Sequence, residues 1–467
     1  MLVPLNDSKD GFMVGLFYFV RREDMHVMES KRYWNEKMET LDAEEFRKVQ
    51  EKNLLKQLAY VWENSPFYQE KFEAAGLKQD DVKGLDDLHK LPFTEKHEIR
   101  ESLGASPPLG KHACVGMDKV IRVYSTSGTT GNPTYIGLTA HDRDTWAEAA
   151  MRAMWTCGMR PEHVVPLPIG TFFIAASYGE AIERLGATLV PVGVGATDRF
   201  LGAVNNLGAD FVLSTASFPL YLMTYCEKKG IDAKALGIRG FMVGGEPGGG
   251  IPHVRQKIET TFGANVQECM GNGDMLGLMW GECEHKNGMH FIGQGICHPE
   301  IINPETGEVL EVKEGLTGEL VYTSLDRECQ PLIRFRTRDH VLVTQTSCKC
   351  GRTGYCIKCI GRTDDMLIVS GVNVYPSAIR DVVGTLLPRV TGEIRVQLHE
   401  PPPSVNPPLK IKVEHGENPG DPEILKRDIE KLLREKLIFS SKVELVPSGT
   451  LPKFEYKAKL VEKTFEK

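Results

Sequence analysis

At 467 residues, the chain is too long for one ordinary hydrophobic core, and its 41% hydrophobic and 25% charged residues are typical of a folded globular protein, so we expect at least two domains. Its net charge of −7 argues against nucleic acid as the main partner, because a phosphate backbone requires clustered Lys and Arg. The apolar stretch GFMVGLFYFV (11–20) is too short to span a bilayer and follows acidic residues, so we expect no membrane partner and no export. We treat residues 1–32 as an N-terminal extension.

The first predicted helix lies within LDAEEFRKVQEKNLLKQLAYVWENSPFY (41–68). Asp42 and Glu45 have the spacing of a capping box, and Pro66 ends the helix. Apolar residues recur at helical spacing and predict one buried face. These residues are Phe46, Val49, Leu54, Leu58, Val61 and Trp62.

Between residues 140 and 270, strand-like and helical patterns alternate, which predicts parallel βαβ units. The predicted strands are GATLVPVG (186–193), ADFVLST (209–215) and IRGFMVGGE (238–246), and the interleaved helices are YGEAIERLG (178–186) and FPLYLMTYCEKKG (218–230). Ligands of such sheets bind beyond the carboxyl ends of the strands. We place YSTSGTTG and VGGEPGGG at such positions.

A turn-rich β segment is predicted from about residue 290 to 360, and a compact α+β region follows it. That region contains the strand patterns GEIRVQLHE (392–400) and PLKIKVEHGE (408–417), then an amphipathic helix at about 422–437. The expected fold class is therefore α/β: a large N-terminal domain of βαβ parallel-sheet layers with a β-rich subdomain (33–363), and a small α+β C-terminal domain (364–467).

The hydroxyl- and glycine-rich segment STSGTTGNP (125–133) lacks the GK[ST] ending of a nucleotide-kinase loop, and taken alone it fits a surface turn as well as a phosphate site. Other motifs accompany it. In order they are GGEPGGG (244–250), MGNGD (270–274), TGEL (317–320), RFRTRD (334–339), GRTDDMLIVSGVNVYPSAI (361–379) and LPKFEYKAK (451–459).

This series resembles the adenylate-forming superfamily of acyl-CoA synthetases. Within that superfamily the chain is similar to the phenylacetate-CoA ligase family. YWNEKMETL (33–41), PLIRFRTRD (331–339) and CKCGRTG (348–354) carry the narrower match.

The resemblance implies a ligase that converts an aromatic carboxylate, such as phenylacetate or indoleacetate, into an acyl-AMP with ATP and Mg²⁺ and then transfers the acyl group to coenzyme A. Two alternatives stay open: transfer to a carrier-protein thiol, and a nucleotide-binding pseudoenzyme. Departures from the family pattern at Met270, Asp274 and Tyr456 motivate the second.

The resemblance also implies roles for individual residues. The phosphate loop is expected to wrap the β- and γ-phosphates with backbone N–H groups and hydroxyls. Its residues are Ser125, Ser127, Gly128, Thr129, Thr130 and Gly131. Lys457 corresponds to the catalytic lysine that contacts the α-phosphate, and Asp274 corresponds to the acid that holds Mg²⁺.

For the remainder of the nucleotide, Gly244, Gly245 and Glu246 are expected to line the adenine pocket. Met270 is expected to pack on the adenine ring, with Gly271 beside it.

Asp339 is expected to accept hydrogen bonds from the ribose hydroxyls, and Arg362 to approach the ribose or a phosphate. Asp364 matches the hinge on which the mobile C-terminal domain rotates. Phe172 and Phe173 offer an aromatic wall for the substrate.

Eleven cysteines with uneven spacing indicate metal chemistry in a reducing compartment, so we expect a cytoplasmic location. The resemblance implies a structural Zn²⁺ held by Cys283, His290, Cys348 and Cys350. His285 is an alternative to His290, and free thiols are a further option. A rival ligand set is Cys348, Cys350, Cys356 and Cys359, but YCIKCI (355–360) reads as a strand that points its cysteines to opposite faces. The oligomeric state is left open, with a homodimer as one option.

Overall fold

The computed structural model describes residues 31–126, 134–170, 174–362, 365–369, 372–400, 402–452 and 460–465. Residues Arg32–Lys467 group as one compact unit. Residues 1–30 of the expected N-terminal extension lie outside the described ranges. Within those ranges, none of the helices combines the length and apolar character needed to cross a bilayer.

The described part of the chain begins with four helices, of which α3 and α4 pack on each other. They are α2 (Glu36–Glu39), α3 (Ala43–Asn64), α4 (Pro66–Ala74) and α5 (Lys96–Ala105). Asp42 supplies its half of the predicted capping box of α3, because its side chain accepts hydrogen bonds from the backbone N–H groups of Glu44 and Glu45 at 2.9 and 2.8 Å. The predicted apolar face buries Leu54 and Val61 completely. Short 3-10 helices occupy Gln79–Asp81, Leu85–Lys90, Met117–Lys119, Ile174–Ser177 and Lys234–Leu236.

The phosphate-loop segment connects two antiparallel strands, β1 (Arg122–Ser125) and β2 (Tyr135–Leu138), and α6 (Ala140–Thr156) follows them. Its expected position beyond a strand of the parallel sheet was therefore wrong. Ser125 pairs with Tyr135, and the Thr126 N–H donates to the Thr134 carbonyl at 3.0 Å. The physical reason is that antiparallel neighbours need only a short connection, whereas parallel neighbours need a crossover helix.

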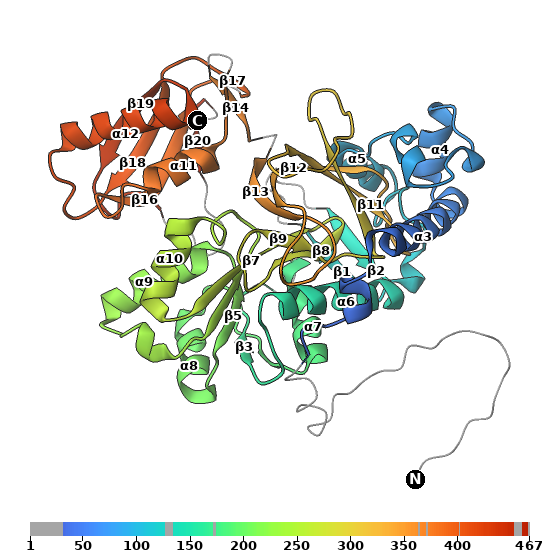
Figure 1. The fold of residues 1–467 in the computed structure, drawn as a ribbon, viewed down its shortest axis with the longest axis horizontal. Helices are drawn as coiled ribbons and strands as arrows, with labels where there is room; N and C mark the ends of the chain where they lie inside the picture. Colours follow the sequence, from blue (N-terminus) through green and yellow to red (C-terminus); the bar gives the residue numbers. More distant parts are fainter. Residues whose placement is uncertain are drawn as a thin grey trace, which may run out of the picture. The chain divides into compact units, whose positions relative to one another are not determined.

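The predicted βαβ alternation is confirmed. Strand β3 (Val164–Pro166) is parallel to β4 (Thr188–Val190), and β5 (Phe211–Ser214) is parallel to β6 (Gly240–Val243). Figure 1 shows helices gathered around β5 and its neighbours. The helices of this region are α7 (Tyr178–Leu185), α8 (Thr197–Leu207), α9 (Ser217–Lys229) and α10 (Pro252–Phe262).

A nine-stranded sheet forms the centre, in the order β10-β11-β12-β13-β9-β8-β7-β6-β5. Its remaining strands are β7 (Asn265–Asn272), β8 (Leu276–Glu282), β9 (Met289–Phe291), β10 (Cys297–Ile302), β11 (Thr317–Ser324), β12 (Phe335–Gln345) and β13 (Cys356–Arg362). Strand β7 is parallel to β6 and antiparallel to β8. The parallel layer and the β-rich subdomain therefore share one continuous sheet.

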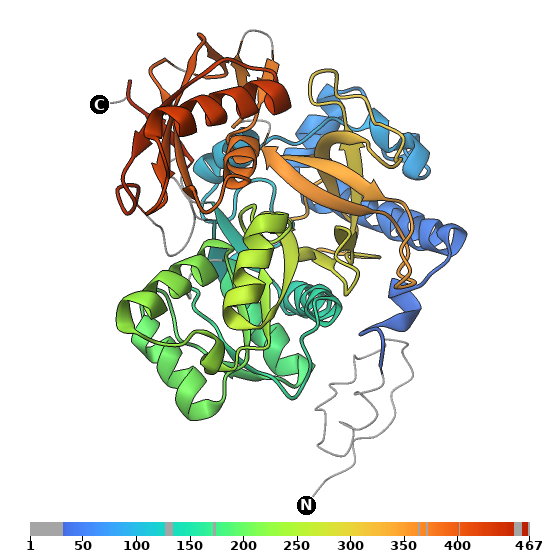
Figure 2. The ribbon, with the colours of Figure 1, turned by 60° about the vertical axis from the view of Figure 1, so that its left-hand side comes forward.

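The C-terminal region has its own four-stranded sheet, β19-β18-β16-β20, with α12 lying across it (Figure 2). The elements are β14 (Leu367–Val369), β15 (Val372–Val374), α11 (Pro376–Gly384), β16 (Val390–Leu398), β17 (Ser404–Val405), β18 (Leu409–His415), α12 (Pro422–Leu437), β19 (Ser441–Val446) and β20 (Val461–Lys463). Both predicted strands and the helix at 422–437 are confirmed. A separate apolar core fills this region. The mixed α/β fold class is therefore confirmed, while Asp364, at the expected boundary, lies outside the described residues.

Candidate active site

Asp274 lies beside Thr134, the residue that directly follows the segment STSGTTGNP (125–133). The Thr134 hydroxyl donates to Asp274 Oδ1 at 3.1 Å, and it also lies 3.0 Å from the Thr126 hydroxyl. Lys96, the first residue of α5, forms an ion pair with the same carboxylate oxygen. The Asp274 side chain is 13% exposed and the Lys96 side chain 26%. A carboxylate, a cation and hydroxyls from distant parts of the chain thus converge on one point.

The backbone around Asp274 is fixed from several sides. Its N–H donates to Asn272 Oδ1 at 3.1 Å, and the buried guanidinium of Arg327 donates to the carbonyls of Asp274 and Met275. Position 271, three residues before Asp274, must be glycine, because a Cβ there would lie 1.7 Å from the Gly277 carbonyl oxygen. The backbone of the turn between β7 and β8, which carries the Asp274 carboxylate, is therefore held by these contacts.

Met270 lies on β7 and is 9% exposed. It belongs to a core cluster that also contains Tyr124, Trp146 and Trp280. The side chain is thus packed within the domain, on the strand that leads into the turn with Asp274.

The GGE segment follows β6, at the carboxyl end of the parallel strands as predicted. The Gly244 N–H donates to the Ser214 carbonyl at 3.0 Å, and a Cβ on Gly244 would lie 2.5 Å from the Cys269 carbonyl oxygen. Gly245 has a φ of +79°, which favours glycine. Glu246 accepts hydrogen bonds from the backbone N–H (2.7 Å) and the hydroxyl of Ser217, so it also fixes the start of α9.

Asp339 and Arg362 are paired across β12 and β13. Arg362 Nη1 donates to Asp339 Oδ1 at 3.1 Å and to the Thr337 carbonyl at 3.2 Å. The two predicted nucleotide-binding residues are therefore neighbours.

The C-terminal region contacts this side of the large domain. Tyr375 stacks on His340 with ring centroids 5.4 Å apart, and Arg380 on α11 donates to the Pro247 carbonyl at 2.6 Å. The loop after β6 is thus in direct contact with the C-terminal region.

Several predicted site residues lie outside the described ranges. They are Ser127, Gly128, Thr129, Thr130, Gly131, Phe172, Phe173, Asp364 and Lys457. Ser125 is described, and its side chain is buried at the end of β1.

The four predicted metal ligands come together. The ligand atoms of Cys283, His290, Cys348 and Cys350 all lie within 4.8 Å of one another, and the described residues contain no other such group of His, Cys, Asp or Glu. Cys283 Sγ is 3.8 Å from Cys348 Sγ, and Cys350 Sγ is 3.4 Å from His290 Nε2. A tetrahedral zinc site with Zn–S bonds of about 2.3 Å has S–S edges of roughly 3.8 Å, so the donor set fits Zn²⁺.

Two thiols of this cluster, Cys283 and Cys350, shift each other's pKa in opposite directions. The pKa of Cys350 is lowered, chiefly because the Cys283 thiol donates to it and also because His290 faces it. The pKa of Cys283 is raised by the same hydrogen bond.

The rival ligand set is not assembled among the described residues. Cys356 Sγ lies 3.4 Å from His290 Nδ1 but does not belong to the close group, and Cys359 donates to the Gly361 carbonyl. The strand prediction for YCIKCI is confirmed, because β13 starts at Cys356.

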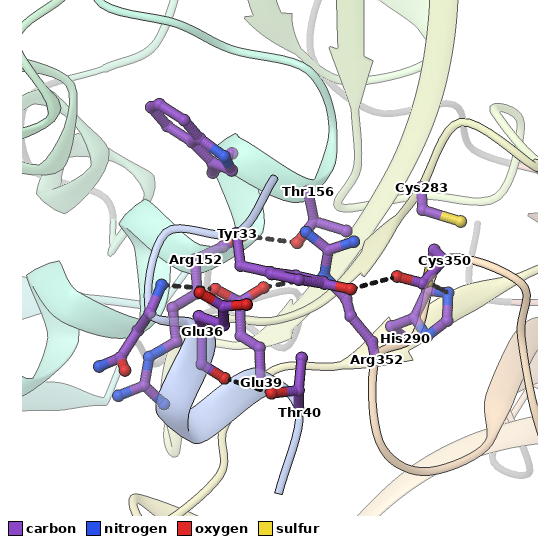
Figure 3. A network of polar contacts seen from close by, with 12 residues as sticks. Tyr33, Glu36, Glu39, Thr40, Arg152, Thr156, Cys283, His290, Cys350 and Arg352 are labelled. Carbon is purple, nitrogen blue, oxygen red and sulfur yellow. Dashed lines mark hydrogen bonds and ion pairs between the residues drawn. The ribbon is translucent and has the colours of Figure 1, made fainter. Parts of the chain in front are cut away.

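The segment before α3 packs directly on the cysteine cluster (Figure 3). The Tyr33 hydroxyl donates to the Cys350 carbonyl at 2.7 Å, and Arg352 Nε is 2.8 Å from Glu39 Oε2. The Arg352 and Glu39 side chains are only 3% and 0% exposed. YWNEKMETL therefore holds the cluster loop in place, a role that its sequence pattern alone did not indicate.

Sequence reasoning missed Lys96 and Arg327. Lys96 lies in PFTEKHEIR (92–100), where a single lysine at a helix start carries no functional signal. Arg327 comes from a loop far along the chain. Both reach Asp274 only through the tertiary fold.

Comparisons with known proteins agree on one family. The sequence profile described as "AMP-binding enzyme" matches residues 5–325, and the profile "AMP-binding enzyme C-terminal domain" matches residues 371–463. The phenylacetate-coenzyme A ligase of Thermus thermophilus is 32% identical over 90% of this chain and 96% of its own length. The Escherichia coli phenylacetate-coenzyme A ligase is 32% identical over 90% of this chain and 95% of its own length.

Among solved structures, a 2-hydroxyisobutyryl-CoA ligase in its postadenylation state superposes with a TM-score of 0.86 at 29% identity, covering 94% of this chain and 93% of that one. The same enzyme in its thioesterification state gives a TM-score of 0.70, covering 98% and 96%. The chain is therefore more similar to the postadenylation arrangement.

The buried ion pair between Arg352 and Glu39, beside the cysteine cluster, predicts how substitutions there change the free energy of unfolding. Arg352→Met leaves Glu39 buried without its cation and should cost about 3–5 kcal/mol. The double variant Glu39→Met/Arg352→Met should recover most of this loss, because the uncompensated charge is gone. Urea unfolding monitored by tryptophan fluorescence measures both effects.

The exposed pair Lys48–Glu44 provides the control. Lys48→Met should change stability by at most about 1 kcal/mol. Equal losses for Arg352→Met and Lys48→Met would contradict the importance of the buried pair.

Proposed function

The chain belongs to the phenylacetate-CoA ligase family of AMP-binding enzymes, and from that premise we propose that its substrate is an arylacetate such as phenylacetate or indoleacetate. It is an AMP-forming acid–CoA ligase. Its carboxylic acid would react first with ATP and then with the thiol of coenzyme A.

The bond changes in the two steps are simple. A carboxylate oxygen forms a bond to the α-phosphorus of ATP while the bond to pyrophosphate breaks, which gives the acyl-AMP. The CoA sulfur then bonds to the acyl carbon, the bond to AMP breaks and the thiol proton leaves. The first step makes a poor acyl donor reactive by attaching a good leaving group.

One observation carries the proposal: the Thr134 hydroxyl and the Asp274 carboxylate share a hydrogen bond of 3.1 Å. Thr134, which directly follows the phosphate-loop segment, and the acid of MGNGD are thus neighbours, which supports a site for a triphosphate and its metal. Mg²⁺ at Asp274 would neutralise phosphate charge. Ser125 and the hydroxyls and N–H groups of residues 127–131 would bind the β- and γ-phosphates.

We assign the base and ribose of the nucleotide to the adjoining strands. Gly244, Gly245 and Glu246 end a parallel strand, where nucleotides bind in such sheets. Met270 and Gly271 on the adjacent strand β7 would complete the adenine pocket. The paired Asp339 and Arg362 would hold the ribose and a phosphate.

A mobile C-terminal domain hinged at Asp364 belongs to the same proposal. Its rotation would bring Lys457 to the α-phosphate for adenylation and remove it for thioester formation. The lower TM-score against the thioesterification state of 2-hydroxyisobutyryl-CoA ligase supports this, since a rearranged relative superposes less well.

Phe172 and Phe173 stay the predicted aromatic wall of the acid pocket. A cytoplasmic location and a homodimer also stay predictions, as does the absence of a nucleic-acid or membrane partner.

The proposed activity is tested by carboxylate-dependent exchange of labelled pyrophosphate into ATP. A panel of phenylacetate, indoleacetate, benzoate and 2-hydroxyisobutyrate should give the highest kcat/KM with an arylacetate. Adding CoA or a carrier protein then identifies the acceptor thiol. No exchange with any acid would favour a nucleotide-binding module without catalysis.

The proposed role of Lys457 predicts different effects of its removal on adenylation and on thioester formation. Lys457→Ala should slow pyrophosphate exchange about 100-fold or more, the typical loss when one preorganised charge is removed. Thioester formation from chemically prepared acyl-AMP should be largely retained. Lys453→Ala, on the same segment, is the matched control. Equal loss in both half-reactions would contradict the assignment.

For the cysteine cluster we propose a structural Zn²⁺ held by Cys283, His290, Cys348 and Cys350. Mass spectrometry of the purified protein should find one zinc per chain. Cys350→Ser should abolish zinc binding, and Cys359→Ser should leave it unchanged. Zinc lost from the Cys359 variant would instead support the rival ligand set.

A further inference from the structure

One face of helix α11 contacts the large domain. Ser377, Arg380 and Gly384 are three and four residues apart in the sequence, so they lie on the same side of the helix. We call this side the docking face. The Ser377 hydroxyl donates to the Ile360 carbonyl at 2.8 Å. The C-terminal region is therefore joined to the large domain through the docking face.

Arg380 connects the docking face to the proposed nucleotide site. Its Nη2 donates to the Pro247 carbonyl at 2.6 Å, and Pro247 directly follows Glu246 in the chain. A hydrogen bond from a charged donor is stronger than one between neutral groups. The segment that we assign to the adenine pocket is therefore tied to the position of α11.

Gly384 allows the end of α11 to approach α10 closely. A Cβ at position 384 would lie 2.2 Å from His253 Nε2 and 2.6 Å from His253 Cε1, so any larger residue would have to displace the imidazole ring. The pKa of His253 is lowered, first by burial and then by the charges of Arg380 and Lys257. The same ring thus faces both Gly384 and the charge of Arg380.

The polar groups of the docking face are not all paired. Within the described part of the chain, Arg380 Nε and Asp381 Oδ1 are buried and find no hydrogen-bond partner. A buried polar group without a partner destabilises the arrangement that buries it. Moving the docking face away from the large domain would let water reach these groups. The contact therefore combines one strong hydrogen bond with an opposing cost, which suits an interface that must be released in each catalytic cycle.

We propose that the docking face of α11 is a latch that holds the enzyme in the arrangement for acyl-AMP formation. Arg380 is a positioning residue that holds the C-terminal domain on the loop after β6, and Gly384 leaves the space that this contact needs. The chain superposes better on the postadenylation state of 2-hydroxyisobutyryl-CoA ligase than on its thioesterification state, with TM-scores of 0.86 and 0.70. The latch is engaged while the acyl-AMP forms and is released before CoA reacts. This inference rests on the proposed function and on the domain rotation that belongs to it.

The test compares the two half-reactions of Arg380→Met with the best acid of the panel. Pyrophosphate exchange requires the latched arrangement, whereas thioester formation from prepared acyl-AMP requires its release. The ratio of the exchange rate to the thioester rate should therefore fall about 10-fold, a loss expected for one hydrogen bond to a charged group. Arg380→Lys keeps a charged donor and should recover part of the ratio.

Gly384→Ala tests the latch without removing a hydrogen bond. Alanine favours a helix more than glycine does, so the C-terminal domain itself should fold at least as stably. The added methyl group should push α11 away from His253 and lower the same ratio roughly fivefold or more, the effect of overfilling a packed contact. Combining this change with His253→Ala removes the ring and should restore a ratio near the wild-type value.

Arg389→Met is the matched control. Arg389 Nη1 is 2.8 Å from Asp428 Oδ2, and both residues belong to the C-terminal region. If Arg380 only stabilises its own domain, Arg380→Met and Arg389→Met will slow both half-reactions alike and leave their ratio unchanged. That result would overturn the inference, as would a Gly384→Ala variant with a wild-type ratio or one that His253→Ala does not relieve.

Hydrogen exchange tests the latch without turnover. Arg380→Met should speed amide exchange in peptides that cover the loop after β6, at residues 244–251, and leave β8 unchanged. Arg389→Met should change neither segment. Equal exchange of this loop in the wild-type and Arg380→Met proteins would contradict the latch.

The outcomes separate the two proposals. A wild-type protein that exchanges pyrophosphate with no acid refutes the proposed function. A wild-type protein that carries out both half-reactions, together with an Arg380→Met variant of unchanged ratio, refutes only the latch.

Discussion

The contact between the Thr134 hydroxyl and the Asp274 carboxylate is the constraint on which the rest of the site depends. The two residues are far apart in the chain, and neither lies on the element that carries the other. Two features make their meeting possible. The antiparallel β1–β2 pair places Thr134 directly before β2, and Arg327 holds the turn after β7 through the Asp274 and Met275 carbonyls. Lys96 then neutralises the carboxylate, which would otherwise be a largely buried, uncompensated charge.

Strand β7 also explains why the parallel and antiparallel parts of the sheet serve one site. On one side it continues the parallel layer, so GGE at the end of β6 lies against Cys269. On the other side it pairs with β8 and leads through the antiparallel strands to Asp339 and Arg362. A nucleotide bound between the end of β6 and the Asp339–Arg362 pair would contact both layers. The C-terminal region contacts the loop after β6 through Arg380.

Much of this arrangement could be predicted from the sequence, for local physical reasons. The Asp42 cap, the βαβ alternation and the helix Pro422–Leu437 follow from periodicity and capping, which depend on neighbouring residues. The hairpin of β1 and β2 was missed because a glycine- and proline-rich turn fits either kind of connection. Lys96, Arg327 and Tyr33 were missed because their partners are brought to them only by tertiary contacts. The cysteine cluster came from family resemblance, and the fold assembles the same four residues.

The most direct test of the central claim is a crystal structure of the protein with Mg²⁺ and a non-hydrolysable ATP analogue. The account predicts phosphate oxygens beside Thr134 and Asp274, and the adenosine along the ends of β6 and β7. A nucleotide bound elsewhere, with no phosphate oxygen beside Thr134 and Asp274, would contradict it.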